Sequence, residues 1–210
     1  EFVNRAFGSE FSYYVEPGRE NIPNGIVSRY PIRSAGEWKD DLTPDRDFAW
    51  AIIDLPGEID LQVVSMHLVS GGSLIETRNT QAEAIEALVA EHFDPDQYIA
   101  VGGDTNIRSM EEPAFDTFDA FLDPFEHIPV DPEGNMNTSE PRTKPYDWVM
   151  PNDLLDARHV PLELDGALFP EGLVFDSYVH TPLPEPVEYE DSHVPGMQHM
   201  PVIKAYEIPR

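Results

Sequence analysis

Two polar residues follow an apolar, strand-forming run in the middle of the chain. The run Tyr98-Ile-Ala-Val-Gly-Gly ends at Asp104, and Asn106 comes two residues later. A carboxylate at a strand end is held rigidly enough to position a water molecule or a metal ion, and a carboxamide can donate to a phosphate oxygen. Residues two apart in an extended chain point to the same side, so both would reach one site. The alternative is an ordinary turn, where Asp and Asn are common.

Three further apolar segments carry a polar residue that could join this site. They are His67 in 61–68, Asp147 in 146–150 and His199 in 198–206. Histidine exchanges protons near neutral pH, and a carboxylate beside it can fix its tautomer. If the segments are strands of one sheet structure, these residues fit a single site at one sheet edge.

Each of the three residues also has a plain structural interpretation. His67 could be a half-buried histidine that only makes hydrogen bonds. Asp147 could form a salt bridge with Arg142 or Lys144. His199 could be a surface residue before an edge strand. The site interpretation is favoured only because all of these residues occur together.

The elements that must position these side chains can be predicted from apolar periodicity and turn residues. Apolar residues recur at helical spacing over Ile75–His92, which predicts a helix that ends before Asp94-Pro95. A second helix, with a weaker pattern, is expected over Glu112–Leu122. The expected strands are Phe11–Val15 and Gly25–Arg29, with a turn at Pro17-Gly18 between them, and a hairpin of Asp47–Leu55 and Ile59–Leu68. Polar loops are expected over Glu133–Thr143 and Pro182–Pro195.

Five short motifs occur in a fixed order along the chain. They are Asn-Gly-Ile-Val-Ser-Arg-Tyr-Pro-Ile at 24–32, Ser-Met-His-Leu at 65–68, Gly-Gly-Asp-Thr-Asn at 102–106, Tyr-Asp-Trp-Val at 146–149 and Gln-His-Met-Pro-Val at 198–202. This set resembles the endonuclease/exonuclease/phosphatase superfamily. The resemblance implies an α/β fold, a four-layer sandwich of two facing, mostly antiparallel β-sheets flanked by helices. Residues 1–210 would form a single domain that lacks the usual N-terminal strands.

The resemblance also implies an activity and roles for the polar residues. The protein would be a metal-dependent phosphoesterase that hydrolyses phosphodiester or phosphomonoester bonds, as a nuclease or a phosphatase. His199 would be the general base, Asp147 would orient it, and Asp104 would orient the water or hold the metal. The cation would be Mg²⁺, with Mn²⁺ or Ca²⁺ as alternatives. Asn106 and His67 would also be catalytic, because they would donate to non-bridging phosphate oxygens or help the leaving group. The expected substrate contacts are Asn106, His67 and Arg29.

Two departures from the family pattern affect the metal. The family's first strands carry an Asn and a metal-binding Glu, and nothing before Phe11 corresponds to them. The final motif reads Met197-Gln198-His199 where the family has Ser-Asp-His, and a neutral Gln is a poorer ligand for a hard cation. We therefore expect weak Mg²⁺ binding, unless a carboxylate of the acidic loop Pro182–Pro195 replaces the lost one.

These departures keep other functions open. The chain could be an inactive member of the same fold that acts as a binding module. It could also be an α/β binding or structural module whose polar strand ends serve a protein or carbohydrate. The sequence indicates no particular protein partner.

Composition excludes some kinds of site but does not fix the compartment. The chain has no cysteine, which excludes disulfides and thiolate metal sites, and it has no apolar run that could cross a bilayer. We expect a soluble protein, with secretion and a periplasmic location both open.

Forty acids against 13 bases give a net charge of −27, which repels polyanions. A small or lipid phosphoester is electrostatically easier to bind than nucleic acid, although charge alone does not decide between them.

The acid-rich, lysine-poor composition resembles proteins of salt-loving microbes, and it predicts stabilisation by salt. Repulsion between surface carboxylates is screened beyond a Debye length of about 10 Å at 0.1 M salt. We expect the melting temperature to rise from low to molar KCl. A melting temperature that stays flat or falls would contradict the halophilic interpretation.

Overall fold

The computed structural model describes residues 2–17 and 22–209, and its centre is a mixed five-stranded sheet. The strands stand in the order β3 (Ile32–Trp38), β4 (Phe48–Ile53), β5 (Leu61–His67), β6 (Tyr98–Asp104) and β7 (Asp147–Pro151). Only β5 and β6 are parallel; the other three neighbouring pairs are antiparallel. The predicted hairpin is confirmed as β4–β5, and β3 is a strand that the sequence pattern did not predict.

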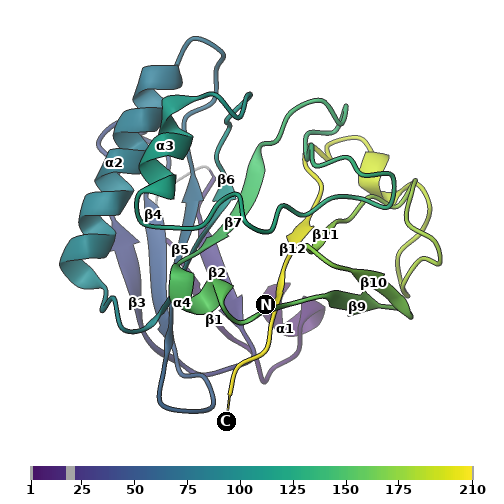
Figure 1. Ribbon diagram of the computed structural model, residues 1–210, viewed down its shortest axis with the longest axis horizontal. Helices are drawn as coiled ribbons and strands as arrows, with labels where there is room; N and C mark the ends of the chain where they lie inside the picture. The colour runs from purple at the N-terminus through teal and green to yellow at the C-terminus, as the bar shows by residue number, and fades with distance from the viewer. Residues whose placement is uncertain (1, 18–21, 210) are drawn as a thin grey trace.

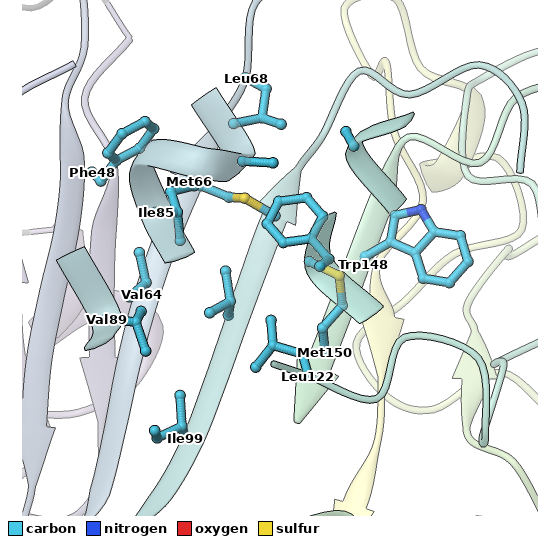
Figure 2. Packing of buried hydrophobic residues seen from close by; sticks show 14 of the residues in the cluster. Phe48, Val64, Met66, Leu68, Ile85, Val89, Ile99, Leu122, Trp148 and Met150 are labelled. Carbon is cyan, nitrogen blue, oxygen red and sulfur yellow. The ribbon is translucent and has the colours of Figure 1, made fainter. Parts of the chain in front are cut away.

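Two helices cover one face of this sheet (Figure 1). Helix α2 spans Ile75–His92, as predicted, and connects the two parallel strands. Helix α3 spans Pro113–Asp119 and is therefore shorter than predicted at its C-terminal end. The apolar stripe of α2 packs onto side chains from alternate positions of the strands, such as Val64 and Met66 of β5 (Figure 2). This alternation places every second strand residue on the helix-covered face.

Shorter strands lie on the other side of the sheet and form four separate pairs. The pairs are β1 (Ser12–Val15) with β2 (Gly25–Ser28), β8 (His159–Val160) with β13 (Ala205–Tyr206), β9 (Leu162–Leu164) with β10 (Ala167–Phe169), and β11 (Leu173–Val174) with β12 (Val202–Ile203). The remaining helices are α1 (Phe2–Ala6), α4 (Asp153–Asp156) and a 3₁₀ turn at Asp191–His193.

The α/β class and the mostly antiparallel pairing are confirmed. In place of one continuous second sheet, however, the described residues form these four two-stranded pairs. One physical reason is proline, which cannot donate to a strand ladder: Pro161 separates β8 from β9, and Pro170 follows β10. The predicted turn at Pro17-Gly18 falls on residues 18–21, outside the described ranges. Within those ranges, every helix is too short or too polar to cross a membrane.

Candidate active site

Three of the predicted residues stand side by side across three neighbouring strands. In the parallel pair β5–β6, His67 is the partner of Asp104, and in the antiparallel pair β6–β7, Asp104 is the partner of Asp147. Each lies at one end of its strand, so the row runs along a single edge of the sheet. Strand register therefore brings together residues that are far apart in sequence.

The row lies on the face of the sheet that α2 and α3 do not cover. Met66 and Trp148 are buried in the cluster under the helices, and they are immediate neighbours of His67 and Asp147 in the chain. Because successive strand residues point to opposite faces, His67, Asp104 and Asp147 point away from the helices. All three are partly exposed, with 22%, 14% and 19% of their side-chain surface accessible.

His199 reaches this row from a different part of the chain. The sequence pattern predicted a strand over Gln198–Tyr206, but the strands there are only β12 and β13, and His199 precedes both. An isolated bridge to Ser139 holds its backbone. The prediction of a continuous strand was therefore wrong, because Pro201 has no N–H to donate to a ladder and the chain is irregular between β12 and β13 at Lys204.

The predicted contact between His199 and Asp147 is present. Nδ1 of His199 lies 2.8 Å from Oδ2 of Asp147. This hydrogen bond raises the pKa of His199 above its usual value, and burial of the ring partly opposes the shift. A proton on Nδ1 that is donated to the carboxylate leaves Nε2 free to accept another. Arg142, one of the alternative partners considered for Asp147, instead forms ion pairs with Asp131 and Asp176.

Asp104 stands between the two histidines. Its Oδ2 atom lies 3.2 Å from Nε2 of His67 and 3.7 Å from Nε2 of His199. Burial, with the negative charge of Asp147 as the next contribution, raises the pKa of Asp104 to about 6. Burial and then the nearby Arg46 guanidinium lower the pKa of His67 to about 4, so His67 is neutral at pH 7. A neutral His67 can still donate one N–H, to Asp104 or to a substrate oxygen.

Asn106 reaches the site through a turn, not through the extended chain that was predicted. Its φ angle of 51° is left-handed, a conformation that Asn tolerates better than most residues. Its backbone N–H donates to Oδ1 of Asp104 at 2.8 Å. Its side-chain amide donates to Oδ2 of Asp104 at 3.1 Å and to the Leu68 carbonyl at 3.0 Å. Asn106 therefore orients the carboxylate that faces both histidines.

The two glycines before Asp104 lie within β6 and do not end the strand. Gly103 has a φ of 135°, and a Cβ atom placed on it would come 2.0 Å from the Met66 carbonyl oxygen. Only glycine allows β5 and β6 to approach this closely. Gly103 pairs with Met66, so this close approach lies directly beside the pair of His67 and Asp104.

Sequence reasoning missed two residues that hold the site together. The Thr138 hydroxyl accepts the Asp147 backbone N–H at 2.9 Å, and the Thr138 carbonyl accepts the Met200 N–H at 2.7 Å. Arg46, which is 7% exposed, donates to the carbonyls of His67 and Leu68 at 2.7 and 3.2 Å. Nothing in the sequence pattern distinguishes them, since Thr138 lies within the polar loop expected over Glu133–Thr143.

Arg29 is not brought to this site. It is exposed, and its guanidinium lies over the Tyr30 ring, 5.3 Å from the centroid. Tyr30 packs against the second apolar cluster, which contains Ile53 and Leu55. Ile53 pairs with Leu61, at the start of β5, whereas His67 is at the end of β5.

A divalent cation would find three ligand atoms here. One atom each from Asp104, Asp147 and His199 lie within 4.8 Å of one another. The two carboxylates are oxygen donors that suit Mg²⁺ or Mn²⁺, whereas an imidazole is a more typical ligand of transition metals such as Zn²⁺. Among the described residues, the acids of the Pro182–Pro195 loop do not join this group. The Asp191 carboxylate instead accepts the Glu188 N–H of its own turn at 2.8 Å.

A pocket of about 610 Å³ opens beside His199. Its walls come from two segments, residues 139–146 and 193–199, which contact each other through the bridge between Ser139 and His199. Gln198, the residue that departs from the family pattern, is also in its lining. His199 thus lies at the edge of a pocket large enough for a small organic ligand, whereas His67, Asp104 and Asp147 do not line it.

Comparison with known structures identifies the fold. D. rerio TDP2 complexed with a single strand DNA product matches with a TM-score of 0.56 at 16% identity, over 81% of this chain and 76% of that one. An endonuclease/exonuclease/phosphatase from Beutenbergia cavernae matches with a TM-score of 0.52 at 16% identity, over 72% and 47%. Sphingomyelinase C from Streptomyces griseocarneus gives 0.50 at 18% identity, over 69% and 62%. No protein-family model and no curated protein matches the sequence.

The chain therefore has the fold of the endonuclease/exonuclease/phosphatase superfamily, as its five motifs predicted. It spans less than two thirds of the length of the sphingomyelinase and of the Beutenbergia protein.

Proposed function

We propose that this protein is a divalent-metal-dependent phosphoesterase in which His199 is the general base. The observation that carries the proposal is the row of His67, Asp104 and Asp147 on adjacent strand ends, with His199 bonded to Asp147. The fold shared with TDP2 and sphingomyelinase C supports phosphoester chemistry over other uses of such a row.

The geometry supports a hydrolytic mechanism in which each residue has one task. Asp147 accepts the proton on Nδ1 of His199 and so keeps Nε2 available as a base. Nε2 of His199 faces the Asp104 carboxylate. A water molecule that contacts both groups could be oriented by Asp104 and lose a proton to Nε2. Neutral His67 would donate to a phosphate oxygen, whereas Asn106, whose amide already donates to Asp104 and to the Leu68 carbonyl, would orient Asp104.

A metal ion, when bound, would polarise the phosphate and favour the ionised form of Asp104. Asp104, in the middle of the row, is the carboxylate that would hold it, although both of its oxygens already accept hydrogen bonds from Asn106. We infer that the cation is Mg²⁺, with Mn²⁺ or Ca²⁺ as alternatives, and that it binds weakly when substrate is absent. A carboxylate that is already hydrogen-bonded is a minimal protein contribution to a magnesium site.

The first test separates a catalytic Asp147 from a structural one. Asp147→Asn keeps the size of the side chain but removes the charge that stabilises the protonated ring. We expect kcat for a phosphodiester substrate to fall by about 10² or more, while the melting temperature changes little. Asp60→Asn is a matched control, because Asp60 is exposed to a similar extent, pairs with Arg33 and precedes the start of β5, whereas the row is at the end of β5. A loss of stability as large as the loss of activity would make Asp147 structural.

The second test addresses the metal. In calorimetric titrations with Mg²⁺ and Mn²⁺, we expect the unmodified chain to bind weakly. Gln198→Asp adds a carboxylate beside His199 and should tighten binding by about tenfold or more, because affinity follows ligand charge. Asp104→Asn should remove binding in either background. Tight binding by the unmodified chain, or no gain from the new carboxylate, would contradict this account.

Gln198 also favours one alternative function, a catalytically inactive protein of the same fold that binds phosphoesters. Assay of the unmodified chain with phosphodiester and phosphomonoester substrates in Mg²⁺ and Mn²⁺ distinguishes the two. Binding without turnover, together with turnover in Gln198→Asp, would support the inactive alternative.

A further inference from the structure

The pocket beside His199 contains a cation with no carboxylate partner. Besides His199, its lining includes an acid, Glu140, a base, Lys144, and a second histidine, His193. Among the described residues, Lys144 forms no ion pair, although the chain carries 40 acids and only 13 lysines and arginines. In so acidic a protein, a half-buried lysine without a partner is available to an anionic ligand.

Glu140, an acidic residue of the pocket lining, contacts His193. A carboxylate oxygen of Glu140 lies 3.5 Å from Nδ1 of His193. Nε2 of that histidine lies 3.3 Å from Asp176, and its ring stacks on Tyr178 with centroids 4.0 Å apart. These contacts hold His193 and favour the orientation of Glu140 toward it, so the Lys144 charge is not neutralised within the pocket.

The backbone of Lys144 is fixed before any ligand binds. Its N–H donates to the Ser139 hydroxyl at 3.0 Å, and its carbonyl accepts the N–H groups of Thr138 and Ser139 at 2.9 and 3.0 Å. The turn just before it is held by Arg142, whose guanidinium reaches two buried carboxylates at 2.6 Å each. A fixed backbone lowers the entropy that binding must overcome.

Tyr146 and Lys144 share one side of the chain that leads into β7. Residues two apart in an extended segment point the same way, and both line the pocket. Pro145, between them, is buried, and its carbonyl accepts the Trp148 indole N–H at 2.7 Å. The Tyr146 ring centroid is 5.6 Å from that of His199, so the Tyr146 ring lies beside the proposed base.

We propose that Lys144 and Tyr146 form a substrate subsite for small phosphoesters that carry a second anionic group. The inference rests on the proposed function, in which the reacting phosphate lies at Asp104 and His199. Lys144 binds the second anionic group by a charge-assisted hydrogen bond, and the part of the molecule that joins the two groups lies against the Tyr146 ring.

A matched pair of substrates tests the subsite. The 4-nitrophenyl ester of thymidine 5′-phosphate contains one reacting diester, and its 3′-phosphorylated form adds a second anion without changing that diester. We expect the unmodified protein to prefer the 3′-phosphorylated form by about tenfold in kcat/KM. Lys144→Ala should remove this preference, and Lys144→Arg should restore most of it. Lys39→Ala should keep it, because exposed Lys39 pairs with Asp41 outside the pocket.

Direct binding separates the subsite from the chemistry. In calorimetry with Mg²⁺, thymidine 3′,5′-bisphosphate should bind the unmodified protein about tenfold more tightly than thymidine 5′-phosphate, and Lys144→Ala should abolish the difference. Lys144→Gln carries the test if the alanine variant does not fold. Equal ratios in the unmodified protein and both variants would overturn the subsite. Failure to hydrolyse either ester, with the binding difference intact, would overturn the proposed function instead.

Discussion

Replacement of His199 with alanine is expected to lower kcat/KM for phosphoester hydrolysis by about 10²–10⁴-fold, the range supplied by a positioned general base. The ring is held by Asp147 on one side and faces Asp104 on the other, so no neighbouring side chain is placed to replace it. His67 is a poor substitute, because burial lowers its pKa to about 4 and makes it a weak base. The measurement is steady-state kinetics with 4-nitrophenyl phosphodiesters in Mg²⁺ and in Mn²⁺.

His92→Ala is the matched control for this variant. His92 is an exposed histidine at the last position of α2, where its ring stacks on Trp38 on the helix side of the sheet. His92→Ala should hydrolyse the phosphodiesters at the rate of the unmodified protein. Both variants should have melting temperatures close to that of the unmodified protein. An active His199→Ala protein would remove the general base from the proposed mechanism.

Gly103→Ala is expected to lower the free energy of unfolding by at least about 3 kcal/mol. A residue with a side chain is strained at a φ of 135°, and strain of this kind costs about 1–3 kcal/mol. The added methyl group would also overlap the Met66 carbonyl oxygen, which belongs to the backbone of the neighbouring strand and cannot rotate away. Urea denaturation followed by fluorescence of the three tryptophans would measure the loss.

Gly134→Ala tests whether the positive φ alone explains such a loss. Gly134 has a φ of 86°, but a Cβ atom there would meet no other atom within 4 Å. We expect it to cost only about 1 kcal/mol. Similar losses at the two positions would mean that β5 and β6 separate to accept the methyl group, and activity should then fall as well, because the register of His67 and Asp104 would change.

The local pattern of apolar residues and prolines was enough to predict much of the fold. The helix α2 was predicted with its observed bounds, because its apolar spacing is long and its end is marked by proline. Strands β5 and β6 were recognisable as apolar runs of ordinary strand length. The pattern did not indicate Arg78, which is fully buried in α2 and pairs with Glu112 at 2.6 Å. A charged residue is expected on the surface unless it has a buried partner of opposite charge. Glu112 is 34 residues away in sequence, so the local pattern around Arg78 does not reveal it.

Residue types and their local pattern show which groups could react: a carboxylate after a buried strand, and histidines and a second carboxylate beside other apolar runs, in a chain rich in acids. That these groups meet depends on the fold. His67, Asp104 and Asp147 form a row because hydrogen bonding between strands sets their register, and register is a non-local property. His199 joins the row through Ser139 and Thr138, in a loop with no distinctive pattern, and Arg29 is placed elsewhere by the packing of Tyr30.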